Sequence, residues 1–345
     1  MDAYPIVRPL LFRLPPDAAH DLAKVVLRRQ GLWRLLARPA VADPRLRTNL
    51  AGLSLASPIG LAPGFDKSGD LVPSLVRLGF GYVVVGSITP EPRRGNPTPR
   101  LLRYVDRQSL ANCMGMPNVG LAEAVRLLSR PRPAGVPVIA SVAGFSPPEL
   151  LSAAATMEPH VDAVEIGLVC RHTPETFDMA ERSSVADLAH GLAKQRTKPV
   201  FVKLPPHFTA AEKQRSMSII DVWADAGLDA LSLSGTRQIN EPRLSMGAGG
   251  LAGKATTEDA LRILDDVASR ARGRLAIKAA GGVFDGQDAY RFLQAGATAV
   301  ELYSAFIYRG WGVANAIARE LIEQLESNGD RNVGEIPRAV APATA

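Results

Sequence analysis

The sequence is poor in cysteine, with only Cys113 and Cys170 among 345 residues. Two thiols cannot build a disulfide framework, and without a Cys-x-x-Cys or paired Cys/His spacing a structural zinc site is not expected. No apolar run reaches the roughly 18 residues that a membrane-spanning helix needs. A secretory signal is also missing, because the apolar piece Pro9–Leu14 is short and contains Arg13. These absences predict a protein of a reducing compartment, the cytoplasm.

Acidic residues are outnumbered by basic ones, 34 against 40, which gives a net charge of +6. Nucleic-acid binding is not expected, because the sequence has no nucleic-acid module and no basic strand interleaved with aromatics. The excess of basic residues consists largely of arginines near the N-terminus. There, residues 1–40 predict two short amphipathic helices, the first capped by Asp17 and the second following Gly31. Such helices either lie in a membrane interface or pack on the protein as a helical cap, and the pattern leaves both open.

From Asn49 onward, apolar β-branched runs alternate with segments of helical periodicity. The runs are nearly continuous in hydrophobicity, as parallel strands covered on both faces should be. No GxGxxG follows the first run, which disfavours a dinucleotide-binding sheet. Eight alternating units predict a closed (β/α)8 TIM barrel over residues 41–325, after a helical extension over 1–40 and before a disordered tail over 326–345. The predicted strands are Ile59–Pro63, Tyr82–Ile88, Val136–Val142, Ala163–Leu168, Val200–Leu204, Ala230–Leu233, Leu275–Ala279 and Ala299–Leu302.

Polar residues and glycines follow the ends of these strands, and a barrel would bring them to one rim, where barrel active sites lie. The segment Ala276–Tyr308 reads as strand, double glycine, helix and strand. Gly281 and Gly282 would leave backbone N–H groups bare for an anionic phosphate, and loops after the last two barrel strands often form such a site. A tight turn without a ligand explains the same pattern, so both readings stay open at this point.

Two further rim residues carry candidate chemistry. Lys203 ends an apolar strand, where a cation would face something anionic or electron-rich, although a solvated lysine is the simpler reading. Cys170 follows a strand and is next to Arg171 and His172, whose charge would lower the pKa of a thiol and allow a thiolate to remove a proton. The simpler reading is a small buried apolar side chain. We expect Asp66 to pair with its neighbour Lys67.

Six ordered motifs resemble those of the dihydroorotate dehydrogenases, FMN enzymes built on a β/α barrel. The likeness is closest to the class 2, quinone-reducing, membrane-associated branch, which has a short helical N-terminal extension. The resemblance implies FMN as cofactor, a small-molecule substrate, quinone as electron acceptor, a place in pyrimidine biosynthesis, and no metal. The motifs are LAPGFDKSG at 61–69, GSITPEPRRGNPTPRLLR at 86–103, NCMGMPNVG at 112–120, GGLAGK at 249–254, AAGGV at 279–283 and LYSAFIYRG at 302–310.

The resemblance also implies roles for individual residues, which fall into three groups. The flavin would contact Gly64, Lys67, Ser87, Ser141, Lys203, Ser234, Gly253, Gly281, Gly282, Tyr303 and Ser304, with its phosphate at Gly253, Gly282, Tyr303 and Ser304. The substrate would contact Lys67, Asn112, Met116, His172 and Thr236. Cys170 would be the proton acceptor and, with Lys67, a catalytic residue.

The substrate half departs from the family pattern, in which one strand end reads N-x-S-S/C-P-N. Here residues 167–172 read GLVCRH, so Gly167 and His172 replace two substrate asparagines. A third asparagine, expected before Thr236, is Gly235. Each unpaired buried polar group costs about 1–3 kcal/mol. We therefore expect dihydroorotate to bind several orders of magnitude more weakly than to the family pattern, unless Arg171 and His172 compensate.

Three functions are compatible with these residues. The first is an FMN-dependent dehydrogenase that oxidises dihydroorotate or a related small dihydro-heterocycle, passes electrons to quinone and lies peripherally on the inner membrane through residues 1–40. The second is a reductase of another heterocycle, with NAD(P)H or a protein partner as electron donor. The third is a non-catalytic FMN-binding protein. The sequence leaves the oligomeric state open.

Overall fold

The computed structural model describes residues 4–38, 40–170, 177–178 and 182–338. Eight parallel strands form a closed barrel in the order β11-β12-β15-β16-β3-β4-β7-β8. All eight predicted strands are present, with ends displaced by no more than a few residues, so the predicted barrel is confirmed. The barrel strands are β3 Ile59–Asp66, β4 Tyr82–Ile88, β7 Val138–Ala143, β8 Ala163–Gly167, β11 Val200–Lys203, β12 Ala230–Ser234, β15 Ala276–Ala280 and β16 Ala299–Leu302.

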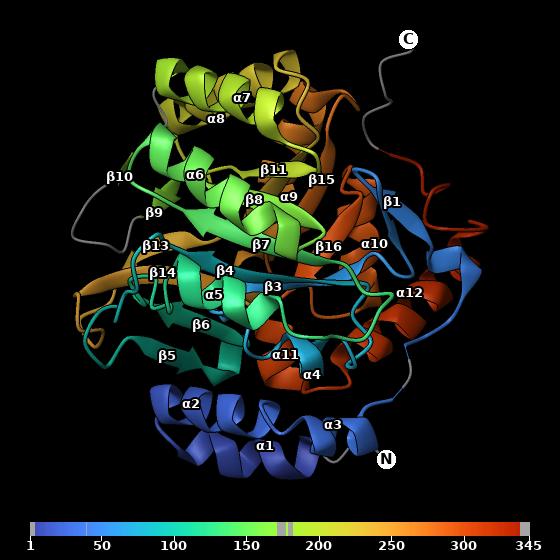
Figure 1. Cartoon of the computed structure of the whole chain (residues 1–345). Helices are drawn as coiled ribbons and strands as arrows, with labels where there is room; N and C mark the ends of the chain where they lie inside the picture. The colour runs from blue at the N-terminus through green and yellow to red at the C-terminus, as the bar shows by residue number, and fades with distance from the viewer. Residues whose placement is uncertain (1–3, 39, 171–176, 179–181, 339–345) are drawn as a thin grey trace.

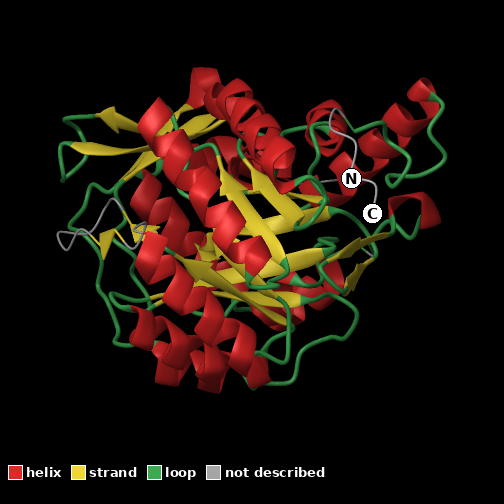
Figure 2. Cartoon of the chain, turned by 90° about the horizontal axis from the view of Figure 1, so that it is seen from above, coloured by secondary structure: helices red, strands yellow, loops and turns green. Residues whose placement is uncertain are grey.

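Helices lie between the strands and surround the barrel (Figure 2). Their sequences contain the expected signals: Thr209 and Glu212 form a capping box at the start of α8, and Asp285 caps α10. The helices that follow the barrel strands are α4 Val72–Leu75, α5 Leu121–Leu128, α6 Pro147–Met157, α7 Arg182–Gln195, α8 Ala210–Asp225, α9 Thr257–Ala271, α10 Gly286–Gln294, α11 Ser304–Arg309 and α12 Val313–Asn328. Single 3-10 turns are η1 Pro44–Leu46, η2 Val105–Arg107, η3 Glu158–His160 and η4 Lys254–Thr256.

The N-terminal extension forms a separate helical layer at the bottom of Figure 1, next to α4 and α11. It holds three helices rather than the two expected: α1 Tyr4–Arg13, α2 Pro16–Leu27 and α3 Gln30–Leu36. The helix α2 begins after Pro15, and Asp17 does not cap it. Instead the Asp17 carboxylate accepts hydrogen bonds from the backbone N–H and the Nε of Arg100, at 3.2 and 3.3 Å. These bonds connect the layer to the segment before strand β5 Leu101–Tyr104.

Between this layer and the barrel lies a four-stranded antiparallel sheet that the sequence did not predict (Figure 1). Its order is β13-β14-β6-β5, from β5 Leu101–Tyr104, β6 Ser109–Asn112, β13 Arg237–Asn240 and β14 Ala248–Gly253. The amino end of the barrel carries the hairpin of β1 Thr48–Leu50 and β2 Leu53–Leu55. Leu50 and Leu55 join a buried cluster with Tyr82 and Phe201 at the starts of barrel strands. The amino end is therefore plugged, and only the carboxyl end is available for a site.

The C-terminal stretch departs from the expectation of a disordered tail from residue 326. The helix α12 continues to Asn328. Beyond it, Val333 and Ile336 are buried, and the Val333 N–H donates to the Arg45 carbonyl at 2.9 Å. The buried side chains and this hydrogen bond hold the segment after α12 against the protein. The last seven residues lie outside the described part.

Candidate active site

A cavity of about 300 Å³ opens at the carboxyl end of the barrel, and the predicted site residues gather around it. They come from the ends of β3, β4, β11, β12, β15 and β16 and from the antiparallel sheet. Because parallel strands deliver their carboxyl ends to one rim, residues distant in sequence meet here. The predicted residues that line the cavity are Gly64, Lys67, Ser87, Asn112, Met116, Lys203, Ser234, Thr236, Gly253, Gly281, Gly282, Tyr303 and Ser304.

The described lining has three charged side chains, Lys67, Lys203 and Glu301, so one positive charge is in excess. Lys67 Nζ donates to the Gly64 carbonyl. Burial lowers the pKa of Lys67 to about 8, and the charges of Lys24 and Arg100 act in the same direction. A cavity with this balance favours an anionic ligand, because such a ligand compensates the buried positive charge.

Asp66 shapes the loop around Lys67 instead of forming the expected pair with it. Its carboxylate accepts bonds from the backbone N–H groups of Ser68, Gly69 and Leu71 at 3.2, 2.8 and 2.9 Å. Burial raises the pKa of Asp66 to about 6, and the charge of Asp70 adds to this. The side chain therefore fixes the turn after β3, which holds Lys67 at the rim.

Three glycines form a narrow part of the cavity at the ends of β14 and β15. Gly253, Gly281 and Gly282 have φ angles of 112°, 146° and 84°, which side chains rarely adopt. A Cβ at Gly282 would lie 2.3 Å from Thr257 Oγ1 and 2.6 Å from the Gly253 carbonyl oxygen. The chain can approach itself and a ligand this closely only without side chains, so the double glycine is required by the geometry of the site.

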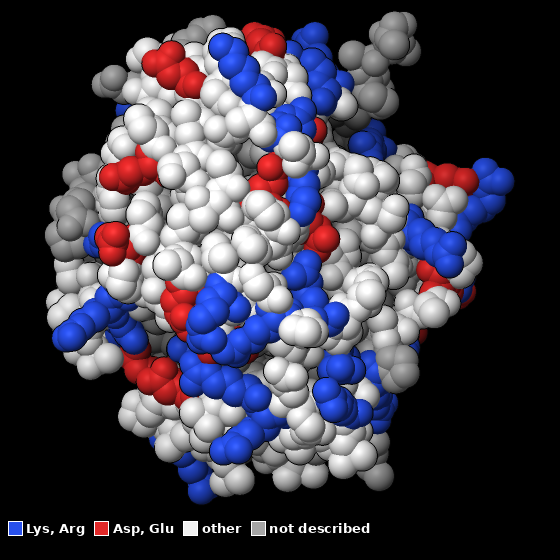
Figure 3. Space-filling view, in the orientation of Figure 1, with Lys and Arg blue, Asp and Glu red and all other residues white. Residues whose placement is uncertain are grey.

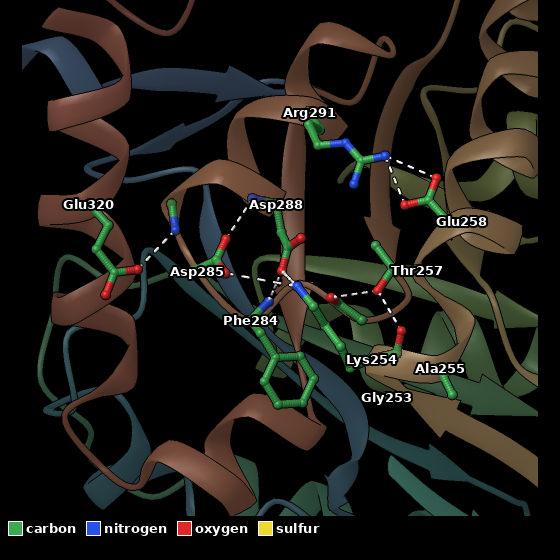
Figure 4. Close-up of polar contacts among 12 residues, drawn as sticks. Gly253, Lys254, Ala255, Thr257, Glu258, Phe284, Asp285, Asp288, Arg291 and Glu320 are labelled. Atoms are coloured by element: carbon green, nitrogen blue, oxygen red, sulfur yellow. Dashed lines mark hydrogen bonds and ion pairs between the residues drawn. The ribbon is translucent and has the colours of Figure 1, made fainter. Parts of the chain in front are cut away.

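A layer of polar contacts behind the glycines holds this loop in place (Figure 4). Thr257 Oγ1 donates to the Gly282 carbonyl at 3.0 Å, and the Phe284 N–H donates to Asp288 Oδ2 at 2.9 Å. Lys254 Nζ donates to the same Asp288 oxygen at 2.6 Å. These bonds join α9, α10 and the loop after β15, so the backbone of Gly281–Gly282 is rigidly supported.

Ser141 is the one predicted cofactor residue that is not part of the cavity lining. It is fully buried on β7, and its hydroxyl lies 3.0 Å from that of Ser87, which does face the cavity. Ser141 therefore orients Ser87 from behind. Tyr303, across the cavity, is within 3.4 Å of the Gly64 carbonyl through its hydroxyl, and burial raises its pKa to about 12.

The predicted substrate residues divide between described and undescribed parts of the chain. Asn112, Met116 and Thr236 line the cavity. His172 lies outside the described residues. The backbone of Cys170 belongs to the short strand β9 Val169–Cys170, which pairs with β10 Phe177–Asp178 next to the barrel rim, while the side chain of Cys170 is outside the description.

The two glycines that stand where the family pattern has asparagine differ in the space around them. A Cβ at Gly235 would lie 2.6 Å from Ala260 Cβ, so a side chain there needs α9 to move. At Gly167 the nearest atom would be the Val142 carbonyl oxygen at 3.4 Å, an ordinary contact distance. The fold has thus closed the position at 235 and left room at 167.

A second cavity of about 320 Å³ lies beneath the N-terminal helices and is almost wholly apolar. It shares Leu101 and Leu110 with the first, so the two cavities meet at β5 and β6. Burial lowers the pKa of His20 to about 3, with a further contribution from Lys67, so this imidazole is neutral at pH 7. The lining from the extension and its neighbours includes Phe12, His20, Ala23, Phe65, Phe306 and Trp311.

Sequence reasoning did not identify Glu301 as a lining residue. Glu301 is on β16, two residues before Tyr303, and belongs to a buried ionic cluster with Lys278 and Glu165. A signal was present in the sequence, because each of these three charged residues interrupts an otherwise apolar strand. Their meeting could not be read from it, since they come from three different strands.

Comparisons with known proteins point to one family. The family model for dihydroorotate dehydrogenase matches residues 45–325. The dihydroorotate dehydrogenase (quinone) of Sphingopyxis alaskensis is 36% identical over 338 residues, covering 92% of this chain and 92% of that protein. The protein of the same name from a Roseiflexus species is 31% identical over 352 residues, with coverages of 96% and 97%.

Solved structures show the same fold. The crystal structure of DHODH from Eimeria tenella in complex with ferulenol has a TM-score of 0.85 and 26% identity, over 95% of this chain and 98% of that one. The ligand-free form from the same organism gives a TM-score of 0.84 and 28% identity. On the family match and the relatives above 30% identity, this chain belongs to the dihydroorotate dehydrogenase family.

Proposed function

We propose that this protein is an FMN-dependent dehydrogenase that oxidises dihydroorotate, or a related small dihydro-heterocycle, and passes the electrons to a quinone. The observation that carries the proposal is the meeting of two unlike cavities at Leu101 and Leu110. One is cationic with a glycine cradle, and the other is apolar and open beneath the helical extension. Relatives named dihydroorotate dehydrogenase (quinone) support the same assignment.

The first cavity fits FMN in two respects. Its cradle combines Gly281, Gly282 and the start of α11 at Ser304, which follow the last two barrel strands, with Gly253 at the end of β14. Backbone N–H groups at this place are where barrels bind phosphate. Lys203 would stand beside the electron-rich part of the ring, where a cation tunes flavin chemistry. FMN, when bound, supplies the acceptor for a hydride from the substrate.

The residues of this chain would supply the proton chemistry and the orientation of the substrate. Cys170, at the end of β9 by the rim, would accept the proton that leaves with the hydride. Asn112 and Thr236 line the cavity and would hold the substrate ring by hydrogen bonds. Lys67, whose lowered pKa reflects its burial, would complete the charge balance for an acidic substrate.

Anaerobic addition of dihydroorotate to the FMN-loaded protein tests the substrate. Because three amide partners are lost, at about 1–3 kcal/mol each, we expect bleaching of the flavin absorbance only at concentrations far above those that saturate a related enzyme with the asparagines. The variant Gly167→Asn, whose Cβ would make only ordinary contacts, is expected to lower the required concentration at least about tenfold, the equivalent of one restored hydrogen bond. Prompt bleaching of the wild type at low concentration would show that the lost amides do not matter.

The apolar cavity would admit the quinone. A quinone ring and its isoprenoid tail need an apolar path that ends close to the flavin, and the cavity under α1 and α2 reaches the partition of Leu101 and Leu110. His20 and Arg103 are two polar side chains in its lining, and the Arg103 guanidinium lies 4.6 Å from the centre of the Phe12 ring. These groups would bind the quinone oxygens.

A bulky side chain in this cavity should slow the reoxidation of the flavin by quinone and leave its reduction by substrate unchanged. In Ala23→Trp the indole would occupy the space under α2, so we expect quinone-dependent reoxidation to slow at least about tenfold, the loss of roughly 1.4 kcal/mol of binding. Reduction of the flavin by substrate should not change. Stopped-flow measurement of both half-reactions separates the two effects.

The matched control is Ala18→Trp, on the same helix but exposed and outside the lining. It should leave both half-reactions as in the wild type. Equal slowing of reoxidation by both variants, or slowing of flavin reduction by Ala23→Trp, would contradict a quinone route through this cavity.

The same helical layer would dock on the inner membrane from the cytoplasmic side. No helix in the described part of the chain is long and apolar enough to cross a bilayer. The layer nevertheless exposes apolar side chains, with Ile6 at 77% and Leu35 at 82% of full exposure. Lys and Arg gather over the same end of the molecule (Figure 3). Apolar side chains ringed by cations suit an anionic lipid surface.

Vesicle sedimentation measures this docking. The double variant Ile6→Asp and Leu35→Asp is expected to lose most of its binding to vesicles that contain anionic lipid, because each change puts a charge on the docking face. The control Met246→Asp removes an exposed apolar side chain from the β13–β14 loop, which is not part of the helical extension. Equal binding by all three proteins would refute this role of the extension.

A further inference from the structure

A cluster of charged side chains lies inside the barrel, directly beneath the rim cavity. Lys278 Nζ donates to Glu165 Oε2 at 2.5 Å, to Glu301 Oε1 at 2.6 Å and to Ser232 Oγ at 2.9 Å. Lys278 and Glu165 are 0% exposed, and Glu301 is 2% exposed. An ammonium group has three donors. Lys278 has therefore used all of them within the cluster.

The cluster contains more carboxylate than its lysine can neutralise. Glu165 and Glu301 each accept one bond from Lys278, and Glu165 Oε1 is buried without a partner among the described residues. Leaving a buried charge uncompensated is costly. The second negative charge must therefore be balanced by a further cation or by a proton on one carboxyl group.

Lys203 is the further cation, and its charge is shared with the cavity. It lines the cavity and acts on both carboxylates, lowering the pKa of each. Any anion that enters the cavity next to Lys203 competes with the carboxylates for this compensation. The charge state of the cluster is consequently linked to the charge of the bound ligand.

Glu301 is the carboxyl group that can respond to this competition. Burial raises the pKa of Glu301, and the charge of Glu165 adds to this rise against the attraction of Lys278. For Glu165, burial also opposes ionisation, but Lys278 and Lys203 outweigh it and bring the pKa to about 2. Glu301 alone of the two lines the cavity, so water entering there can exchange a proton with it.

We propose that Glu301 takes up a proton from water in the cavity when the flavin is reduced and releases it on reoxidation, with Lys278 as the residue that positions it. The inference rests on FMN occupying the cavity, as proposed above. Reduction adds negative charge to the flavin near Lys203. The compensation available to Glu301 falls, and its carboxylate becomes a neutral carboxyl group by binding one proton. The carboxyl group itself is neither oxidised nor reduced.

The charged and titratable groups near Glu301 come from several barrel strands. The other lysine of the cavity, Lys67, lies at the end of β3 and does not join the cluster. The phenol of Tyr82 remains protonated, because burial and the two carboxylates raise its pKa well above the usual range. The titratable groups that act on Glu301 are Lys278 from β15, Glu165 from β8, Lys203 from β11 and Tyr82 from β4.

A redox titration of the FMN-loaded protein without substrate or quinone tests the proposal. The midpoint potential is measured at several pH values between about 7 and 9, a range above the ordinary pKa of a carboxyl group and of histidine. Its slope gives the number of protons bound per two electrons. A reduced flavin held as an anion beside Lys203 takes up one proton per two electrons. We expect more than one in the wild type, approaching two.

Three variants make the test specific. Glu301→Gln removes the proton acceptor, and Glu165→Gln removes the excess carboxylate, so both should bind about one proton fewer per two electrons than the wild type. Any proton taken up by Lys67, whose pKa of about 8 lies within this pH range, is common to all these proteins. Glu258→Gln, a surface residue paired with Arg291 at 2.8 Å, should keep the wild-type value. Because Glu165 does not line the cavity, its variant also separates charge balance from direct contact with the flavin.

Two results would overturn the proposal: one proton per two electrons in the wild type, or an unchanged value in Glu301→Gln. Neither result would affect the assignment of substrate and quinone, because neither compound is present in the titration. A wild-type protein that binds no FMN would overturn the proposed function and this inference together. If the wild type binds more than one proton per two electrons but dihydroorotate does not bleach the flavin, the inference stands and dihydroorotate is removed as the substrate.

Discussion

Replacing Cys170 with alanine should leave the yellow FMN complex intact and slow substrate-dependent bleaching by about 100- to 10,000-fold, the range for loss of a positioned general base. Cys170 ends strand β9 beside the barrel rim, and the motif resemblance implies that it is the proton acceptor. A thiol has an unperturbed pKa of about 8.5, so its thiolate form is accessible near neutrality. The rate of flavin reduction in an anaerobic stopped-flow experiment, with any dihydro-heterocycle that bleaches the wild type, is the measurement.

The control for this experiment is the other cysteine. Cys113 is buried in a small cluster with Ala111 and Leu244, and its Sγ lies 3.6 Å from Ser245 Oγ. Cys113→Ala should therefore reduce the flavin at the wild-type rate. Bleaching of Cys170→Ala at an unchanged rate would remove Cys170 from the mechanism. Loss, in this variant, of the rise in rate with increasing pH would assign that rise to deprotonation of the thiol.

A second large effect is expected from Gly282→Ala, which should yield a folded protein that is purified without colour. The new Cβ would lie 2.3 Å from Thr257 Oγ1 and 2.6 Å from the Gly253 carbonyl oxygen, at a φ angle of 84°. Positive φ costs a side chain about 1 kcal/mol and overpacking costs about 1–3 kcal/mol more. If the loop moves to relieve this strain, its N–H groups leave the phosphate position, and we expect FMN affinity to fall at least about 100-fold.

Gly227→Ala provides the comparison, because Gly227 has a φ angle of 68° but an added Cβ there meets nothing within 4 Å. It lies between α8 and β12, at the plugged end of the barrel. Both variants place a side chain at a positive φ angle. Only Gly282→Ala adds a steric clash, and only Gly282 lines the cavity. Flavin content after release from the protein, read with the unfolding temperature of both apoproteins, separates loss of the cradle from loss of the fold. Full flavin content in Gly282→Ala would place the phosphate elsewhere.

The barrel could be predicted from the chain because its strands are local patterns. The run at Tyr82–Ile88 is apolar and β-branched throughout, as a strand covered on both faces must be, and glycine or proline lies close to most such runs. The rim residues follow from topology, since any parallel barrel collects the residues after its strands. Motif resemblance then narrowed the cofactor to FMN.

Other parts of the site depend on pairings between distant residues. In the antiparallel sheet Gly250 lies opposite Asn112, and neither segment carries a strong strand pattern of its own. The apolar cavity exists because α1 and α2 lie against this sheet and α11, and the sequence left the role of these helices open between a cap and a membrane element.

The chain by itself determined the eight strands, the glycine cradle and the identity of the rim residues, because hydrophobic periodicity and backbone freedom are properties of neighbouring residues. The tertiary structure alone decided that Lys278 reaches Glu165, 113 residues away, and that two unlike cavities share a wall. Closure of the barrel is the physical reason, since it brings side chains from non-neighbouring strands into one interior, where burial turns three ordinary charges into a coupled group.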